Sequence, residues 1–246
     1  MSAPLLQILP VDGHRPVLLS DDLQARLQAL YERVPSVSCA CDRLGQCCEL
    51  TEAEAEADFA TMYPLYVVEY LNIVDYLCTH FDSERREQVL GMMDERPERC
   101  PFLTDVGGCS IHPARPMACR TYGILNREQV EETASKARGE VPRSWISSFL
   151  FTERHTVCPH TTVREPEKVA PHARAMVAFE YERELLRMGQ EVDLLGDARR
   201  QAFLDVTGLV RPTRWTWGGF NTLARSSAGW FKRCFAAYWK RAFLGE

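Results

Sequence analysis

The feature that most constrains this chain is the crowding of seven of its ten cysteines into two short stretches. The first stretch is Cys39-Ala-Cys41-Asp-Arg-Leu-Gly-Gln-Cys47-Cys48, and the second contains Cys100, Cys109 and Cys119. Neither stretch has the apolar periodicity of a long helix or a strand, and glycine or proline interrupts both, which predicts loops. Thiols gathered in loops bind soft metal ions or form disulfides, and the choice between the two decides the chemistry.

The rest of the sequence favours metal binding over disulfides. The first ten residues lack the basic segment of a secretory signal. No apolar run approaches the roughly 18 to 20 residues that a membrane span needs. We therefore expect a cytoplasmic protein, whose thiols stay reduced. The net charge of −5 argues against a dedicated nucleic-acid binder.

Apolar periodicity predicts a mainly α fold. Ser20 is the expected cap of a helix that places Leu23, Leu27, Leu30 and Tyr31 on one face and ends at Val34-Pro35. A capping-box pattern at residues 51–54 predicts a helix directly after Cys48. Further helices are predicted at residues 64–80, from residue 82 or 83 to 97, at 171–188 and at 194–209.

The second cysteine stretch predicts two small elements. Residues 100–109 are typical of a tight hairpin with its turn at 105–108, and a short helix that begins at Pro116 would carry Cys119. We therefore expect helices around a loop-rich cysteine cluster, stapled by metal, with one short hairpin. The predicted organisation is a helical segment at 1–35, a metal-binding domain at 36–164 and a helical extension at 165–246.

Residues 211–246 differ from the rest in charge. They hold seven Lys or Arg and one Glu, hence a net charge of +6, and four of the five tryptophans. On a helical wheel one face collects the apolar and aromatic residues Phe231, Cys234, Phe235, Tyr238, Trp239 and Ala242. A basic, aromatic amphipathic helix suits peripheral contact with an anionic membrane or a protein partner. The alternative is that this tail packs its apolar face onto the acidic remainder of the same chain.

Thiolate is a soft ligand that selects zinc, Cu(I) or iron–sulfur clusters, and both zinc and clusters commonly take four thiolates. Sequence leaves zinc and an iron–sulfur cluster as alternatives. Eight cysteines are predicted as metal ligands: Cys39, Cys41, Cys47, Cys48, Cys100, Cys109, Cys119 and Cys158. Eight thiols would suffice for two four-thiolate sites. Cys78 is instead expected to pack in the core, and Cys234 to belong to the tail.

Charged and nitrogen-bearing side chains flank these thiols. Arg115 and Arg120 lie on either side of Cys119 and are predicted to offset the charge of a thiolate-bound cofactor, with surface ion pairs as the alternative. His112 follows Cys109 by three residues and is either a nitrogen ligand or structural. His155 and His160 on either side of Cys158 raise the same question.

Several of these elements, in this order, resemble the YkgJ-type cysteine-cluster family, also called the CxxCxxCC family. The elements are Gly-x-Cys-Cys at 45–48, Cys-Pro-Phe-Leu at 100–103, and Cys-x-Ile-x-x-x-Arg-Pro-x-x-Cys-Arg at 109–120. Cys158-Pro159 is similar to the family's late Cys-Pro element. The chain departs from the family pattern at Leu44, where a cysteine is usual, and at His112, where tyrosine is frequent.

The resemblance implies a zinc- or iron-chelating domain of a mostly bacterial family. We therefore predict a metal-binding protein with a redox or metal-handling role. One branch of the family includes flagellin lysine methylases, so a metal-dependent protein-modifying enzyme is the alternative. The chain has no His-Glu-x-x-His, phosphate loop, Gly-x-Gly-x-x-Gly or nucleophile elbow that would support this alternative independently.

Overall fold

A computed structural model describes residues 18–40, 45–49, 65–92, 99–125, 129, 132–133, 135, 160–178, 180–194, 204–205 and 223–224. This part of the chain is mostly helical, which confirms the prediction of a mainly α fold. Its helices are α1 (Asp21–Glu32), α3 (Val67–His80), α4 (Ser83–Leu90), α5 (Met117–Thr121), α8 (Val169–Val177) and α9 (Glu180–Leu194). Short 3-10 turns are η1 (Gln46–Cys48), η3 (His112–Ala114) and η5 (Pro166–Lys168).

Helix α1 forms where the sequence predicts it. The Ser20 side chain accepts a hydrogen bond from the Leu23 N–H and caps the helix, whose buried face consists of the four predicted residues Leu23, Leu27, Leu30 and Tyr31. The chain entering this helix is held by a buried carboxylate. Asp75 of α3 accepts hydrogen bonds from the backbone N–H groups of Leu18 (2.8 Å) and Leu19 (3.1 Å).

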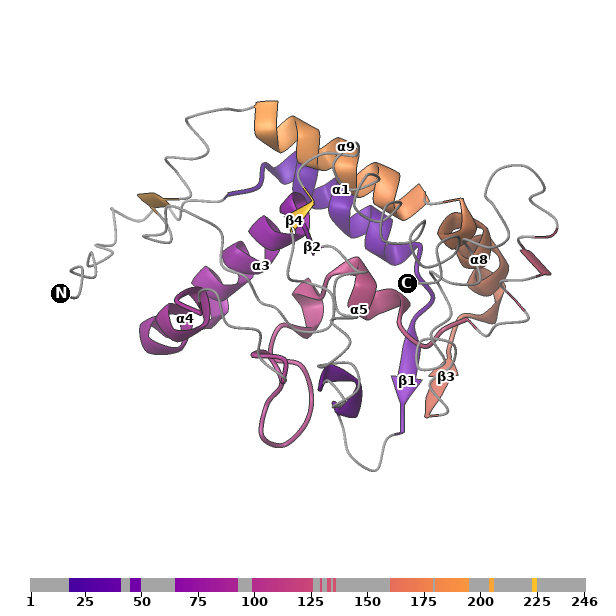
Figure 1. Ribbon diagram of the computed structural model, residues 1–246, viewed down its shortest axis with the longest axis horizontal. Coiled ribbons are helices and arrows are strands. Elements are labelled where there is room, and N and C mark those ends of the chain that lie inside the picture. Colours follow the sequence, from indigo (N-terminus) through magenta and orange to yellow (C-terminus); the bar gives the residue numbers. More distant parts are fainter. Residues whose placement is uncertain are drawn as a thin grey trace, which may run out of the picture.

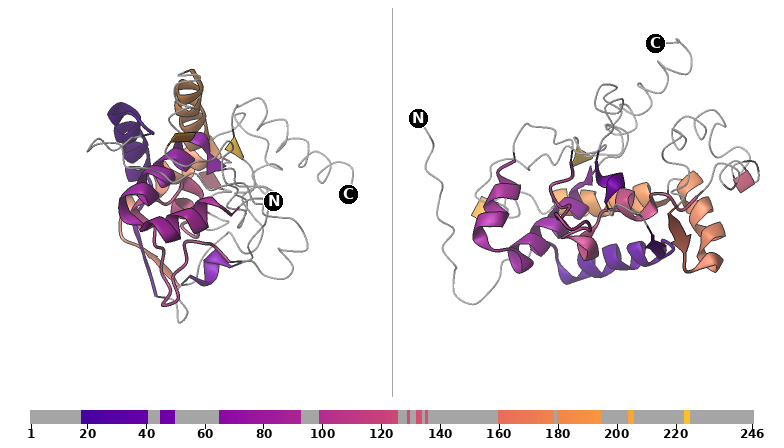
Figure 2. Two further views of the ribbon diagram at one scale, coloured as in Figure 1. Left: turned by 90° about the vertical axis from the view of Figure 1, so that its left-hand side faces the viewer. Right: turned by 90° about the horizontal axis from the view of Figure 1, so that it is seen from below.

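Helices α1, α3 and α9 pack against one another and enclose much of the described core (Figures 1 and 2). Helix α3 is buried almost all round, as its continuous apolar sequence predicts. At the edge of this layer the Arg26 guanidinium makes a two-point ion pair with Glu191, at 2.6 and 2.7 Å. Of these three helices, α3 also packs against turn η3, which follows Cys109.

Three helix boundaries differ from the predictions. Residues 65–66 form strand β2 (Leu65–Tyr66), so α3 begins at Val67. Helix α4 has Asp82 as its cap, as expected, but ends at Leu90 because Gly91 follows as its C-cap. The predicted helix at 171–188 is two helices, because the chain leaves helical geometry at Ala178. A hydrogen bond between His172 and Tyr181 (2.9 Å) connects α8 to α9.

The structure also contains strand pairs that sequence analysis missed. Strand β1 (Val37–Cys39) pairs antiparallel with β3 (Thr161–Val163), and the Ala40 N–H continues the ladder to the carbonyl of His160 at 2.8 Å. Strand β2 pairs in parallel with β4 (Leu223–Ala224). These strands are only two or three residues long, and their pairing joins positions more than 120 residues apart. No local sequence pattern therefore predicts the pairing.

Several predictions fall on residues outside the described part of the chain. They include the helix expected after residue 51, most of the helix at 194–209, and the basic tail at 211–246 apart from residues 223–224. The proposed division into three segments also stays a prediction. Among the helices that are described, none combines the length and apolar character that a bilayer crossing requires.

Candidate functional site

The first cysteine loop is shaped by Gly45. Its backbone has φ of +83°, which favours glycine, and the Cys48 N–H donates to the Gly45 carbonyl at 2.8 Å to close turn η1. A Cβ at position 45 would lie 2.1 Å from Cδ1 of Leu103, which belongs to the second cysteine stretch. Gly45 is therefore needed both for the turn and for the close approach of the two stretches.

Backbone pairing joins the two stretches directly. The Cys100 N–H donates to the Cys48 carbonyl at 2.8 Å, and Glu49 and Arg99 form an isolated antiparallel bridge. The Arg99 guanidinium also lies 3.6 Å from the Glu49 carboxylate. Sulfur-bearing positions some fifty residues apart in sequence are thus neighbours in the fold.

The predicted hairpin follows Cys100. Leu103 and Cys109 form its bridge, and the Ser110 N–H donates to the Phe102 carbonyl at 2.8 Å. Gly107 and Gly108 supply the positive φ angles of the turn, at +76° and +109°. The hairpin carries Cys109 back toward the first loop.

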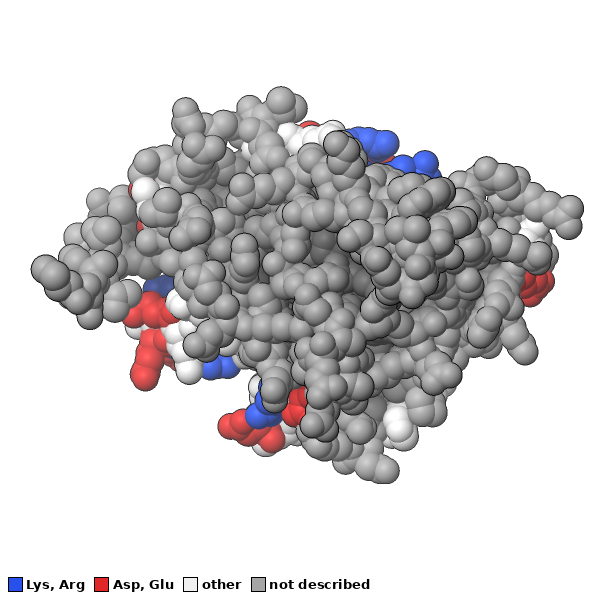
Figure 3. Space-filling view, in the orientation of Figure 1, with Lys and Arg blue, Asp and Glu red and all other residues white. Residues whose placement is uncertain are grey.

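Where this hairpin and α4 reach the surface, charged side chains of both signs lie next to one another (Figure 3).

Two short helical turns bring the third part of the site into place. Turn η3 follows Cys109, and α5 begins after Pro116, as the sequence predicts, and carries Cys119. Arg120 fastens this segment: its Nε donates to the Arg115 carbonyl at 2.7 Å and a terminal nitrogen to the Pro113 carbonyl at 2.6 Å. Its guanidinium also lies 3.9 Å from the centre of the Tyr31 ring.

Five cysteines lie near one another as a result, and we call them the five-thiol group: Cys47, Cys48, Cys100, Cys109 and Cys119. Cys47 is exposed, Cys100 is buried, and the other three are half-buried; all are free thiols rather than disulfides. Each lies close enough to others of the group to shift their ionisation, as the pKa values of Cys48, Cys100, Cys109 and Cys119 record. The group draws on three segments of the chain.

The pKa shifts have clear physical causes. A hydrogen bond with the Cys47 side chain, followed by burial, raises the pKa of Cys48 well above its usual range. Burial raises the pKa of Cys100 to about 12. Burial also raises the pKa of Cys119, and the neighbouring Cys100 and Cys109 raise it further. Burying several thiolates together without a cation is unfavourable, so the thiols hold their protons until a cation offsets the charge.

Two arginines act in the opposite direction. Arg115 and Arg120 both lower the pKa of Cys109 against the effect of burial, and Arg115 does the same for Cys119. The buried Nε of Arg115 has no hydrogen-bond partner within the described residues. Both guanidinium groups therefore lie near enough to lower the pKa of Cys109, and their role in offsetting the charge of a bound cofactor stays a prediction.

The remaining predicted ligands are placed elsewhere or are outside the described residues. Cys39 is exposed on β1, with its sulfur 4.0 Å from the Thr161 hydroxyl, and it does not join the five-thiol group. His112 lies on η3 and is exposed overall, but its partial burial and the two arginines lower its pKa. His160 is exposed beside β3. Cys41, Cys158 and His155 lie outside the described residues.

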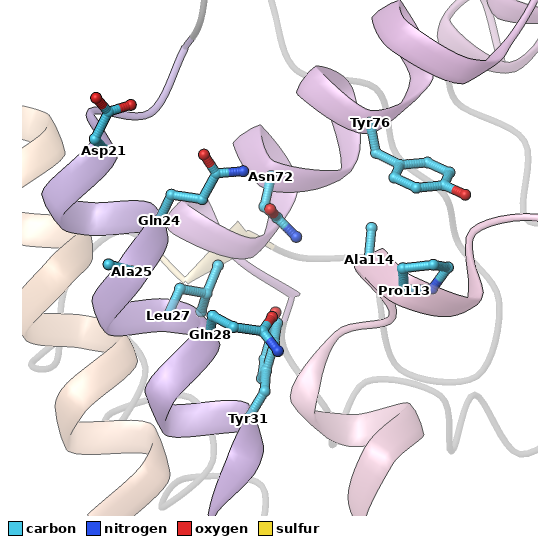
Figure 4. Close-up of a pocket in the computed structure, with 10 residues that line it drawn as sticks. All are labelled: Asp21, Gln24, Ala25, Leu27, Gln28, Tyr31, Asn72, Tyr76, Pro113 and Ala114. Carbon is cyan, nitrogen blue, oxygen red and sulfur yellow. The ribbon is translucent and has the colours of Figure 1, made fainter.

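A cavity of about 490 Å³ lies between α1, α3 and η3. Gln24 and Gln28 of α1 and Asn72 of α3 extend into it, and Pro113 and Ala114 form the opposite wall (Figure 4). No cysteine is among the described residues that line it. Tyr31 is shared, since it lines the cavity while its ring packs against Arg120.

Sequence analysis missed Glu69, a buried acid on α3. Burial raises its pKa to about 7, although hydrogen bonds from Met117, Tyr31 and Tyr66 act against this shift. Its only sequence signal is a carboxylate inside an apolar run, Val67-Val68-Glu69-Tyr70-Leu71. Such a residue must find partners in the folded chain, but the sequence does not say which.

The donor set of the five-thiol group fits a soft metal ion, because sulfur is its only side-chain donor type. Within the part of the chain that the structure describes, no three His, Cys, Asp or Glu side chains are already close enough to form a metal site. The sulfurs are therefore neighbours rather than preformed ligands. Metal binding would have to draw them together.

Comparison with known families agrees with this chemistry. Residues 40–138 match the CxxCxxCC family model, described as a "putative zinc- or iron-chelating domain", which confirms the resemblance inferred from the sequence. The match includes Cys41 and the whole five-thiol group, and it leaves out Cys39 and Cys158. No curated protein and no solved structure matched the chain.

Proposed function

We propose that this chain binds a metal centre through the five-thiol group and Cys41, because residues 40–138 match the CxxCxxCC family model of a "putative zinc- or iron-chelating domain". The single observation that carries the proposal is the convergence of five reduced cysteines from three segments. The metal centre is either a zinc ion or an iron–sulfur cluster, because thiolates favour soft metals. Cys39 and Cys158 fall outside the matched residues, and their role as ligands stays a prediction from the sequence.

The chemistry of the surrounding residues supports this role. A bound cation removes the penalty for burying thiolates, so metal binding would release protons from Cys48, Cys100 and Cys119 and stabilise the fold. Arg115 and Arg120 would offset the remaining negative charge, as positive groups near a thiolate centre do. A four-thiolate zinc would be structural, whereas an iron–sulfur cluster would supply electron transfer. The reduced thiols this requires are those of a cytoplasmic protein.

The test is to purify the chain without oxygen and measure zinc, iron, acid-labile sulfide and the visible spectrum. Iron and sulfide in equal amounts with a brown colour would identify a cluster, and stoichiometric zinc in a colourless protein would identify a zinc site. Neither metal in stoichiometric amount would refute the proposal.

Single substitutions then test the ligand set. Cys47→Ser and Cys119→Ser should each lose metal, because serine oxygen is a poor ligand for soft ions. Cys78→Ser is the matched control: Cys78 is half-buried on α3 and packs against the hydrophobic core. It should keep its metal, and a Cys78→Ser protein without metal would show that the ligands have been assigned wrongly.

A further inference from the structure

Glu69 connects three helices through one buried carboxylate. Its side chain is 1% exposed in the first turn of α3. Its Oε1 accepts hydrogen bonds from the Met117 backbone N–H (2.6 Å) and the Tyr31 hydroxyl (3.0 Å), while Oε2 accepts a longer one from the Tyr66 N–H (3.4 Å). These donors belong to α5, to α1 and to the residue that caps α3.

The bond to Met117 matters most for the five-thiol group. Met117 is the first residue of α5, so its N–H has no partner within the helix, and Pro116 before it provides no side-chain cap. Helix α5 spans only five residues and is too short to be stable by itself. Glu69 supplies the acceptor that its first turn lacks, two residues before Cys119.

A second set of contacts holds the other end of α5 to the same place. Arg120 directly follows Cys119, and its guanidinium lies against the ring of Tyr31, whose hydroxyl donates to Glu69. The Cys119 N–H itself donates to the Pro116 carbonyl at 3.0 Å. Cys119 is thus held between two anchors, Met117 on Glu69 and Arg120 on Tyr31, and both anchors lead back to α1 and α3.

We propose that Glu69 is a positioning residue of the thiol site: by accepting the Met117 N–H it fixes the start of α5 and so the place of the Cys119 sulfur. This role deepens the proposed metal binding and rests on it. The other four thiols of the group are placed by the loop pairing around Gly45 and Leu103, which does not involve Glu69. Loss of the Glu69 acceptor therefore affects Cys119 selectively.

Two substitutions at position 69 separate the acceptor from the charge. Glu69→Gln removes the charge but keeps an Oε1 acceptor for Met117 and Tyr31. Glu69→Met removes charge and acceptor at similar volume and leaves the Met117 N–H buried without a partner. Charge removal alone makes the Cys119 thiol more acidic, because Glu69 raises its pKa. The comparison of Met with Gln, rather than with the parent protein, thus isolates the loss of the acceptor from the loss of the charge.

The first readout is the rate at which iodoacetamide alkylates each cysteine of the purified protein, resolved by peptide mass spectrometry. Without the buried acceptor, α5 should unfold locally more often. Cys119 in Glu69→Met should therefore react about tenfold faster than in Glu69→Gln. Cys100 should react equally in both. Equal Cys119 rates in the two variants would overturn the proposal, whatever metal the protein binds.

A second variant removes the same bond from the other side. Met117→Pro deletes the N–H while keeping Glu69, and proline is well tolerated at the first position of a helix. It should raise the Cys119 rate as Glu69→Met does, and it keeps the test valid if Glu69→Met does not fold. Asp75→Asn is the control for general loosening, because Asp75 is a buried carboxylate on the same helix that holds Leu18 and Leu19 instead. It should leave the Cys119 rate unchanged.

The last readout links the position of Cys119 to the metal. Cobalt(II) bound by thiolates has charge-transfer absorption that grows with the number of thiolates. In Glu69→Met this absorption should fall by the contribution of one thiolate, and cobalt should bind about tenfold more weakly, as in Cys119→Ser. Glu69→Gln should keep the parent's absorption and affinity. If the parent protein shows neither a thiolate–cobalt band nor an iron–sulfur cluster, the proposed function fails. If it shows the cobalt band and Glu69→Met keeps the full band, the role of Glu69 fails alone.

Discussion

Replacing Gly45 with alanine tests whether the two cysteine stretches approach as closely as their packing requires. Two costs add. An L-residue at φ of +83° costs about 1 to 2 kcal/mol. The new methyl would also stand 2.1 Å from Cδ1 of Leu103, and forcing extra volume into a packed site costs about 1 to 3 kcal/mol. Leu103 is only 9% exposed, so it cannot simply swing into solvent. Gly45→Ala should therefore lose roughly 2 to 5 kcal/mol of stability.

A double-mutant cycle separates the two costs. Leu103→Ala removes the clashing atoms at its own cost of about 2 to 5 kcal/mol. In the double variant the methyl at position 45 has room, so only the backbone cost of Gly45→Ala should remain. The double variant should then be more stable than the sum of the single effects by about 1 to 3 kcal/mol. Gly108→Ala is the matched control, because its φ is +109° and the nearest atom is Thr104 Oγ1, at 4.0 Å.

The assay is urea unfolding followed by circular dichroism at one fixed metal content. The slope against urea should be the same for all variants, so that the midpoints compare stabilities. Additive effects of Gly45→Ala and Leu103→Ala would refute the reasoning, since they would mean that residue 45 does not pack beneath Leu103. In that case the two stretches would not meet in the way that places the five-thiol group.

Two further predictions concern buried polar groups outside the thiols. Burial lowers the pKa of His172 to about 4, so the unfolded chain takes up this proton first and stability falls as the pH drops from 6.5 to 4, by on the order of 3 kcal/mol. Unfolding of the parent protein and His172→Gln across this pH range should show that difference, and parallel curves would contradict it. Asp75→Asn should cost about 1 to 3 kcal/mol, because one of the N–H groups of Leu18 and Leu19 then loses its acceptor. Thermal unfolding measures this loss of stability, and an unchanged midpoint would mean that the hydrogen bonds from Leu18 and Leu19 to Asp75 do not stabilise the fold.

The elements that could be predicted from the sequence are those with local causes. The Ser20 cap and the apolar spacing from Leu23 to Tyr31 determine α1 from within a single segment. Glycines at 107 and 108 predict the turn of the hairpin in the same way. The sequence predicts one helix at 171–188 because apolar spacing continues across Ala178, whereas the structure has two helices, α8 and α9, joined by a hydrogen bond between His172 and Tyr181.

The thiol chemistry shows the same division. Cysteine type and spacing indicate soft-metal binding without any structure, since the donor atom determines which ions are preferred. Spacing does not tell which thiols meet. Cys39 lies only eight residues from Cys47, yet it is exposed on β1, while Cys119, more than seventy residues away, joins the group.

The amino-acid sequence by itself determined the helices with clear caps, the hairpin and the kind of ligand this chain offers. Only the tertiary structure decided that five of the cysteines are neighbours, that Leu103 occupies the space above Gly45 and that Glu69 holds the start of α5. The reason is physical. Caps, turns and donor chemistry act between residues close in sequence, whereas a buried carboxylate or thiol takes its partners from whichever segments packing brings beside it.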